Sequence, residues 1–431
     1  MKAKLTTIKD GFKNVIKGLG TRGDSRTSVI YSPNRDINYT TANDLYTSNW
    51  LAAKVVDTPI DDATRKWRSL LIPDPEKKAK IEEAFKKYGL KNKINLAMKW
   101  SRVFGGSVIV IIIDGDDQEE ALDLESIKKD SLKNLVVLDR YNIHPEVINR
   151  DILSENYGKP DFYIVSRGGQ RIHYSRVIRF EGSVSTIRQM EKRNFWGSSI
   201  YKKLFDPIMD SQTVSNSISN LIYESNVDVY RVEGLYKMVA EGNDDLVVKR
   251  LKIAHQMKSI INAVVLDQKD EYDKKSNTFA NLPEIDDRFI QKVAGASNIP
   301  VTRLLGISPA GQNATGESDM RNYYDSVSSL QENEIRPKLT ILDTIILASV
   351  FGKYESFEYE FLPLQQLTDK EQAEVDLQKA QRDQIYLDLD VIESIDSLSE
   401  LAENGTYNSI DENRVEEEKS LRELSFEENE N

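Results

Sequence analysis

The segment Ile299–Pro337, IPVTRLLGISPAGQNATGESDMRNYYDSVSSLQENEIRP, joins the end of one expected helix to a longer one through a loop of small residues. The seven central residues of the loop, Pro309–Thr315, include two alanines and no charge. This composition suits neither a packed core nor a tight grip on an anion. Thr315 is expected to cap the longer helix, which places Glu317 in the first turn, where the helix dipole favours acids.

The residues after this loop follow the period of an amphipathic helix. Its apolar positions are Met320, Tyr323, Tyr324, Val327 and Leu330. Pro337 is expected to end this helix, because proline lacks a backbone N–H and clashes with the preceding turn. A further helix from Leu339 to Val350 and a strand from Phe357 to Leu364 are expected to follow.

Length and composition exclude several classes of protein. The chain has 431 residues, enough for more than one domain, and no cysteine. It therefore has no disulfide, zinc-thiolate site or thiol nucleophile. The longest apolar run, Val108–Ile113, is well short of the ~18 residues that a membrane helix needs, so it predicts a buried strand and no membrane span.

The negative charge of the chain is concentrated near its C-terminus. From Gln365 onward lie 20 of the 70 acidic residues and 6 of the 58 basic residues, a net charge of −14. The preceding residues therefore carry a net charge of only +2. The acidic segment begins with residues expected to form thin amphipathic helices, and its end, from Glu412, is expected to be disordered.

The order of helical and strand patterns predicts an α+β protein. A short basic amphipathic helix at residues 8–19 could contact a partner, an anionic lipid or DNA, or simply dock on its own protein. The other expected elements, in order, are helices within 41–102, strands at 103–113, 135–143, 161–166 and 171–180, a helix at 206–226, an α/β insertion with strands at 226–235 and 262–268 around a helix at 246–260, and a returning helix at 286–298.

Two candidate chemical sites, a metal site and a phosphate-binding loop, have little support. Asp61 and Asp62 could hold a metal, but the nearby Lys66 and Arg68 favour a solvated salt-bridge network. Gly105-Gly106 precedes a strand and no Gly-Lys-Ser/Thr follows, so a phosphate-binding loop is not expected.

The histidines do not make a catalytic pair. His173-Tyr174-Ser175 has the His-x-Ser form of two-histidine phosphoesterases, but neither His144 nor His255 is followed by a second such motif. No Gly-x-Ser-x-Gly elbow singles out a serine nucleophile. The sequence therefore predicts no catalytic residue, no metal site and no cofactor.

Two long motifs in the correct order resemble phage portal proteins, in particular the phage-associated portal branch of the head-to-tail connector superfamily. They are NDLYTSNWLAAKVVDTPIDDATRKWRSL at Asn43–Leu70 and the Ile299–Pro337 segment quoted above. The resemblance runs from about Thr40 to about Val350. It implies a non-enzymatic dodecameric ring at one capsid vertex, through which double-stranded DNA is packaged and ejected. The second hypothesis is a phage-encoded phosphodiesterase related to portal fusions, which counteracts nucleotide signalling.

The resemblance also implies a division of the chain into portal domains. They are an N-terminal arm at 1–40, a helical and β wing at 41–205, a first stem helix at 206–226, a clip at 227–284, a second stem helix at 285–299, a channel loop at 300–316, the long helix and wing return at 317–364, and an acidic helical crown with a disordered tail at 365–431.

Site residues and partners follow from these domains. The expected DNA-channel residues are Gln312, Asn313, Thr315 and Glu317. Lys249 and Lys252 of the clip are expected to dock the terminase large subunit and later the head-tail adaptor. The resemblance further implies contact with the major capsid protein and scaffold, assembly in the host bacterial cytoplasm and a final location in the virion.

Overall fold

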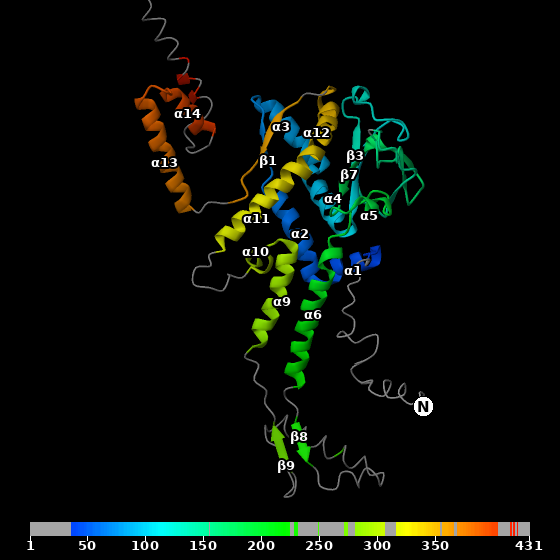
Figure 1. Ribbon diagram of the computed structural model, residues 1–431. Helices are drawn as coiled ribbons and strands as arrows, with labels where there is room; N and C mark the ends of the chain where they lie inside the picture. Colours follow the sequence, from blue (N-terminus) through cyan, green and yellow to red (C-terminus); the bar gives the residue numbers. More distant parts are fainter. Residues whose placement is uncertain are drawn as a thin grey trace, which may run out of the picture. The chain divides into compact units, whose positions relative to one another are not determined.

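The computed structural model describes residues 36–154, 156–224, 228–231, 249, 271–274, 281–306, 316–353, 356–365, 369–403, 414–415, 417–418 and 420. The expected basic helix at 8–19, most of the 227–284 insertion and the end of the acidic tail lie outside the described residues. The chain divides into two compact units, Met1–Leu362 and Pro363–Asn431. Helices and antiparallel sheets are mixed in the first unit, which confirms the α+β class (Figure 1).

Four helices begin the first unit. They are α1 (Tyr39–Ser48), α2 (Trp50–Arg65), α3 (Pro75–Tyr88) and α4 (Leu90–Phe104). Asn49 separates α1 from α2 because its side chain accepts hydrogen bonds from the N–H groups of Leu51 and Ala52 and so starts a new helix. Between α2 and α3 lies a strand that the sequence did not predict, β1 (Arg68–Leu71), which pairs antiparallel with β10 (Glu358–Phe361).

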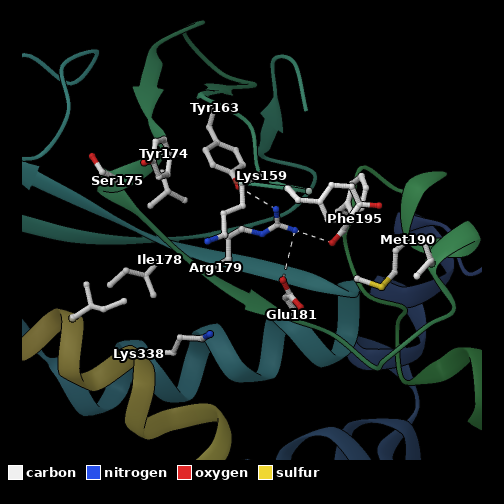
Figure 2. A pocket seen from close by; sticks show the side chains of 15 residues that line it. Lys159, Tyr163, Tyr174, Ser175, Ile178, Arg179, Glu181, Met190, Phe195 and Lys338 are labelled. Atoms are coloured by element: carbon white, nitrogen blue, oxygen red, sulfur yellow. Dashed lines mark hydrogen bonds and ion pairs between the residues drawn. The ribbon is translucent and has the colours of Figure 1, made fainter. Parts of the chain in front are cut away.

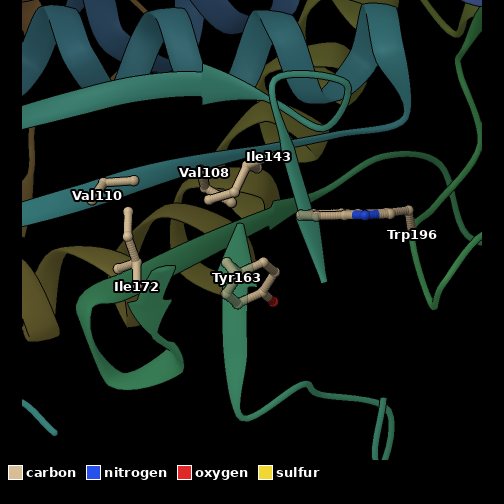
Figure 3. Packing of buried hydrophobic residues seen from close by; sticks show 6 residues of the cluster. All are labelled: Val108, Val110, Ile143, Tyr163, Ile172 and Trp196. Atoms are coloured by element: carbon tan, nitrogen blue, oxygen red, sulfur yellow. The ribbon is translucent and has the colours of Figure 1, made fainter. Parts of the chain in front are cut away.

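Two three-stranded antiparallel sheets follow. The first has the order β3-β2-β7, with strands Leu132–Asp139, Gly106–Ile113 and Val177–Glu181. The second has the order β4-β5-β6, with strands Ile143–Pro145, Phe162–Val165 and Arg171–His173. A buried apolar cluster joins the two sheets: Val108, Val110, Ile143, Tyr163, Ile172 and Trp196 (Figure 3). Gly106 is needed here, because a Cβ atom at this position would lie 2.4 Å from the Trp196 ring.

Two predicted strands are each broken in the structure. The expected strand at 135–143 divides into β3 and β4, because the Asp139 carboxylate accepts bonds from the N–H groups of Tyr141 and Asn142 and turns the chain. The expected strand at 171–180 divides at the 3-10 turn Tyr174–Arg176, so β6 and β7 belong to different sheets. The alternating apolar pattern continues across both breaks, which is why the sequence suggested single strands.

The two predicted helices that flank the insertion pack side by side (Figure 1). They are α6 (Tyr201–Glu224), which follows the short helix α5 (Ile187–Glu191), and α9 (Leu282–Ser297). Helix α6 begins five residues earlier than expected, since Tyr201 and Leu204 are fully buried and anchor its first turn. Within the described part of the insertion, β8 (Asp228–Arg231) pairs antiparallel with β9 (Glu271–Lys274).

The long helix differs from its prediction at both ends. Helix α10 (Val301–Leu305) precedes the loop, and α11 (Glu317–Leu330), a π-helical turn (Gln331–Ile335) and α12 (Arg336–Phe351) follow it. Pro337 does not end the helix, because it lies in the first turn of α12, where a missing N–H is tolerated. Thr315 does not occupy the cap position, which belongs to Gly316 with a φ of 67° and no side-chain cap bond.

The second unit contains two of the expected helices, α13 (Asp369–Asp388) and α14 (Ser394–Glu403). Apolar side chains on these helices remain exposed, among them Leu377 and Ile385. Among the described residues, no helix is both long and apolar enough to cross a membrane.

Candidate DNA-channel site

The candidate site starts from the pair of helices α6 and α9. Asn49 donates a hydrogen bond to Gln212 at 3.1 Å, and Ser215 of α6 donates one to Asp286 of α9 at 2.7 Å. From Leu204 to Glu224, α6 carries no lysine or arginine. The pair therefore offers hydroxyl, amide and carboxyl groups with few cations to hold a phosphate backbone.

Asp62 of α2 binds the helices on both sides of residues 306–316, the uncharged part of the predicted channel loop. Its two carboxylate oxygens accept hydrogen bonds from Arg303 Nε at 2.8 Å and Arg303 Nη2 at 2.7 Å, in the last part of α10. The Tyr323 hydroxyl of α11 donates to the same carboxylate at 2.9 Å. The helix before the loop and the helix after it are therefore both hydrogen-bonded to the side chain of Asp62.

The environment of Asp62 makes this contact strong. The Asp62 side chain is only 1% exposed, so its charge requires partners, and Arg303 meets both oxygens in a bidentate pair. The hydrogen bond to Asp62 raises the pKa of Arg303. Burial, followed by the charge of Asp62, raises the pKa of the Tyr323 hydroxyl, which therefore stays protonated as a donor.

Two further bonds hold the same flanks on α2. Lys54 donates to the Leu304 carbonyl oxygen at 2.9 Å, at the end of α10. The buried Gln331 amide, in the π turn after α11, donates to the Ala63 carbonyl oxygen at 2.7 Å. Helix α2 is therefore the common support of the helices before and after the loop.

Asp61 forms a half-exposed ion pair, as predicted, but its partner is Lys99 at 2.7 Å and not the expected Lys66 or Arg68. The predicted salt-bridge network is wrong for Asp62 and for Arg68, which are buried; Arg68 makes a bidentate pair with Asp343 of α12. The sequence held one missed signal, because Asp62 lies seven residues after Val55 on the apolar face of α2. Among the described residues, no cluster of three or more acidic or histidine side chains could hold a metal ion.

The structure describes only two of the predicted site residues, Glu317 and Lys249. Gln312, Asn313 and Thr315 lie outside the described residues. Glu317 begins α11, is exposed and forms an ion pair with Arg321 at 3.6 Å. Lys249 is helical and exposed, while Lys252 lies outside the described residues.

The histidine geometry does not suit two-histidine catalysis. His144 and His173 lie on β4 and β6 with β5 between them and two residues apart in register, which corresponds to a separation of about 12 Å. His173 Nδ1 is instead 2.8 Å from the hydroxyl of its own neighbour, Ser175. Burial and the nearby Arg176 lower the pKa of His173. His255 lies outside the described residues.

The structure thus combines paired helices around an insertion with two helices, before and after an uncharged loop, that both bind one carboxylate. The chain belongs to the phage portal protein family, which its residues 40–385 match. The fold is similar to that of a chain in the structure "Neck of native GTA particle computed with C12 symmetry", with a TM-score of 0.50, 12% identity, and 85% of this chain and 94% of that chain covered.

Two relatives carry a different name. A protein of Caulobacter sp. (strain RHG1) named "Anti-CBASS protein Acb1" is 36% identical over 86% of this chain and 62% of its own length. A protein of Sphingomonas paeninsulae with the same name is 34% identical over 94% of this chain and 67% of its own length. This chain thus spans about two thirds of each relative, and the rest of each relative has no counterpart in the match.

Proposed function

We propose that the protein forms a dodecameric portal ring at one capsid vertex, the conduit through which double-stranded DNA is packaged and ejected. The observation that supports this most directly is the attachment of both flanks of an uncharged loop to Asp62. A loop fixed at both flanks can keep its place while DNA moves past it. Neutral amides such as Gln312 and Asn313 can touch phosphates without holding them, since phosphate affinity comes mainly from lysine and arginine.

The mass of the purified protein in solution tests this proposal. We expect a closed ring of about a dozen 49.2 kDa subunits by native mass spectrometry and light scattering. A monomer under all assembly conditions would contradict the proposal.

A phosphodiesterase is the second candidate function, favoured by the names of the two relatives. Those names describe proteins of which this chain spans only part, and the described histidines lie apart. We therefore propose that the protein is not an enzyme and uses no cofactor. Incubation with cyclic dinucleotides and trinucleotides should give no hydrolysis beyond that of a His173→Ala variant. Turnover that is lost in this variant would favour the second candidate.

The partners in the proposal follow the order of capsid assembly. The ring would form in the host cytoplasm with the major capsid protein and scaffold, and would then remain in the virion. The proposed domains retain the boundaries given above, with a wing at 41–205, stem helices at 206–226 and 285–299, a clip at 227–284, a channel loop at 300–316 and a crown from 365. The clip would bind the terminase large subunit during packaging and the head-tail adaptor afterwards.

Charge reversal in the clip is expected to weaken terminase binding. Lys249 is exposed, so replacing Lys249 and Lys252 by Glu should remove favourable long-range attraction without disturbing the core. We expect terminase affinity to fall by roughly tenfold and ring mass to stay unchanged. Lys80→Glu, at a side chain of α3 that is 62% exposed, is the control and should bind normally. Unchanged affinity after replacement of residues 227–284 would place the docking surface elsewhere.

Truncation after Leu364 is expected to leave a soluble, folded protein. The cut lies next to the boundary between the two compact units, so the first unit keeps its own internal contacts. The lost segment carries a net charge of −14, and we propose that it faces packaged DNA and repels it. Thermal unfolding of the shortened chain should shift by only a few degrees. Insoluble protein would show that the acidic segment belongs to the core.

A further inference from the structure

A turn in the first unit exposes three apolar side chains almost fully to solvent. Val147 is 73% exposed, Ile152 is 79% exposed and Leu153 is 94% exposed. We call residues 147–153 the apolar turn. Clustered exposed apolar residues of this size commonly mark an interaction site.

Side-chain hydrogen bonds give the apolar turn a fixed shape. The N–H of Asp151 donates to Asn149 Oδ1 at 2.9 Å, and the N–H of Leu153 donates to Asp151 Oδ1 at 3.0 Å. Asn149 Nδ2 donates to Ser154 Oγ at 2.8 Å. At the base, the N–H of Asn149 donates to the Lys159 carbonyl oxygen at 3.0 Å. The exposed leucine is therefore presented by a folded turn.

A groove of about 510 Å³ lies beside β7, α5 and α12 (Figure 2). Its apolar wall includes Ile178, Ile187, Met190, Phe195 and Ile341, of which Ile187 and Ile341 are exposed. Lys159 and Lys338 also line it, so we call it the lysine-lined groove. Its volume is within the range of sites that enclose a few side chains.

The lining of the groove carries three cationic side chains and one carboxylate, which leaves an excess of positive charge. Arg179 forms an ion pair at 4.0 Å with Glu181, which also lines the groove. It further contacts the Tyr163 hydroxyl at 3.3 Å, the Phe195 carbonyl oxygen at 2.9 Å and the face of Trp196 at 4.0 Å. Lys159 and Lys338 have no carboxylate within ion-pair distance among the described residues. The groove thus fits an apolar side chain accompanied by an acid.

We propose that the apolar turn of one copy inserts into the lysine-lined groove of the next copy around the ring. Leu153 would fill the apolar part of the groove, and Asp151 would pair with Lys338. This inference rests on the proposed ring function. A closed ring joins two different surfaces of each subunit, and a turn and a groove are such a complementary pair.

The reach and the exposure of Leu153 leave its side chain free to contact another copy. Leu153 lies four residues from the base of the turn at Asn149, so its Cα can extend at most ~14 Å from that base. Its 94% exposure shows that it does not fill the groove of its own subunit. The side chain is thus available to a neighbour.

Disulfide cross-linking tests the contact, because the chain has no native cysteine. A Leu153→Cys, Ile341→Cys double variant, which places both cysteines in the apolar part of the groove, should give a ladder of covalent oligomers on a non-reducing gel after mild oxidation. Each single variant should give none. A covalent dimer that Leu153→Cys forms alone would indicate a symmetric two-copy contact and overturn the proposal, as would monomers only.

The mass of the same samples separates two kinds of failure. Complete rings without a ladder would overturn the turn-and-groove contact and leave the portal function intact. Absence of rings in the unmodified protein would overturn both. As a second measurement, Leu153→Asp should raise the protein concentration needed for half assembly by about tenfold or more. Leu124→Asp, at a leucine that is also exposed, is the matched control and should assemble normally.

Discussion

Replacing Asp62 by alanine is expected to destabilise the protein by about 2–4 kcal/mol and to loosen both flanks of the channel loop. The change leaves Arg303 without its bidentate partner and Tyr323 without its acceptor. The expected cost is somewhat below that of breaking a fully buried pair, since the Arg303 side chain is 37% exposed and water can reach it. Denaturant unfolding measures the change in stability.

Asp61→Ala is the matched control for this prediction. Asp61 is the adjacent residue on the same helix, but its side chain is 52% exposed, so loss of its pair with Lys99 should cost less than about 1 kcal/mol. Hydrogen exchange of α10 and α11 should rise in Asp62→Ala and remain unchanged in Asp61→Ala. Equal stability of the two variants would mean that Asp62 does not fix the loop flanks.

Replacing Gln312 and Asn313 by lysine is expected to slow DNA packaging or ejection by an order of magnitude or more. Two added cations per subunit would place a ring of positive charge around the duplex, and each phosphate contact would hold the DNA by releasing counterions. The defect should weaken as salt concentration rises. Packaging into purified proheads at several salt concentrations measures both the rate and its salt dependence.

The control for the loop variant removes the polar amides and keeps the charge. Gln312→Met with Asn313→Leu preserves approximate size and adds no cation, so packaging should stay close to normal. Normal packaging by rings that carry both lysines would mean that other residues form the constriction. In that case the loop would serve only to connect α10 and α11.

Sequence patterns identified most helices and strands because a repeat of about 3.6 or 2 residues is a local property. The helix at 206–226 and the returning helix at 286–298 appear as α6 and α9, with ends that differ by a few residues. Patterns failed where a single residue acts differently from its usual tendency in that pattern. Asp139 turns the chain between β3 and β4, and Pro337 continues a helix that it was expected to end.

The sequence by itself determined the absence of thiol chemistry, the neutrality of residues 306–316 and the concentration of acid after Gln365, since these depend only on which residues are present. Only the tertiary structure decided that Asp62 is buried and joins Arg303 and Tyr323, more than 200 residues away in the chain. It likewise decided the pairing of Arg68 with Asp343. The physical reason is that a buried charge must be neutralised by whichever partner the fold brings near, and spacing along the chain does not specify that partner.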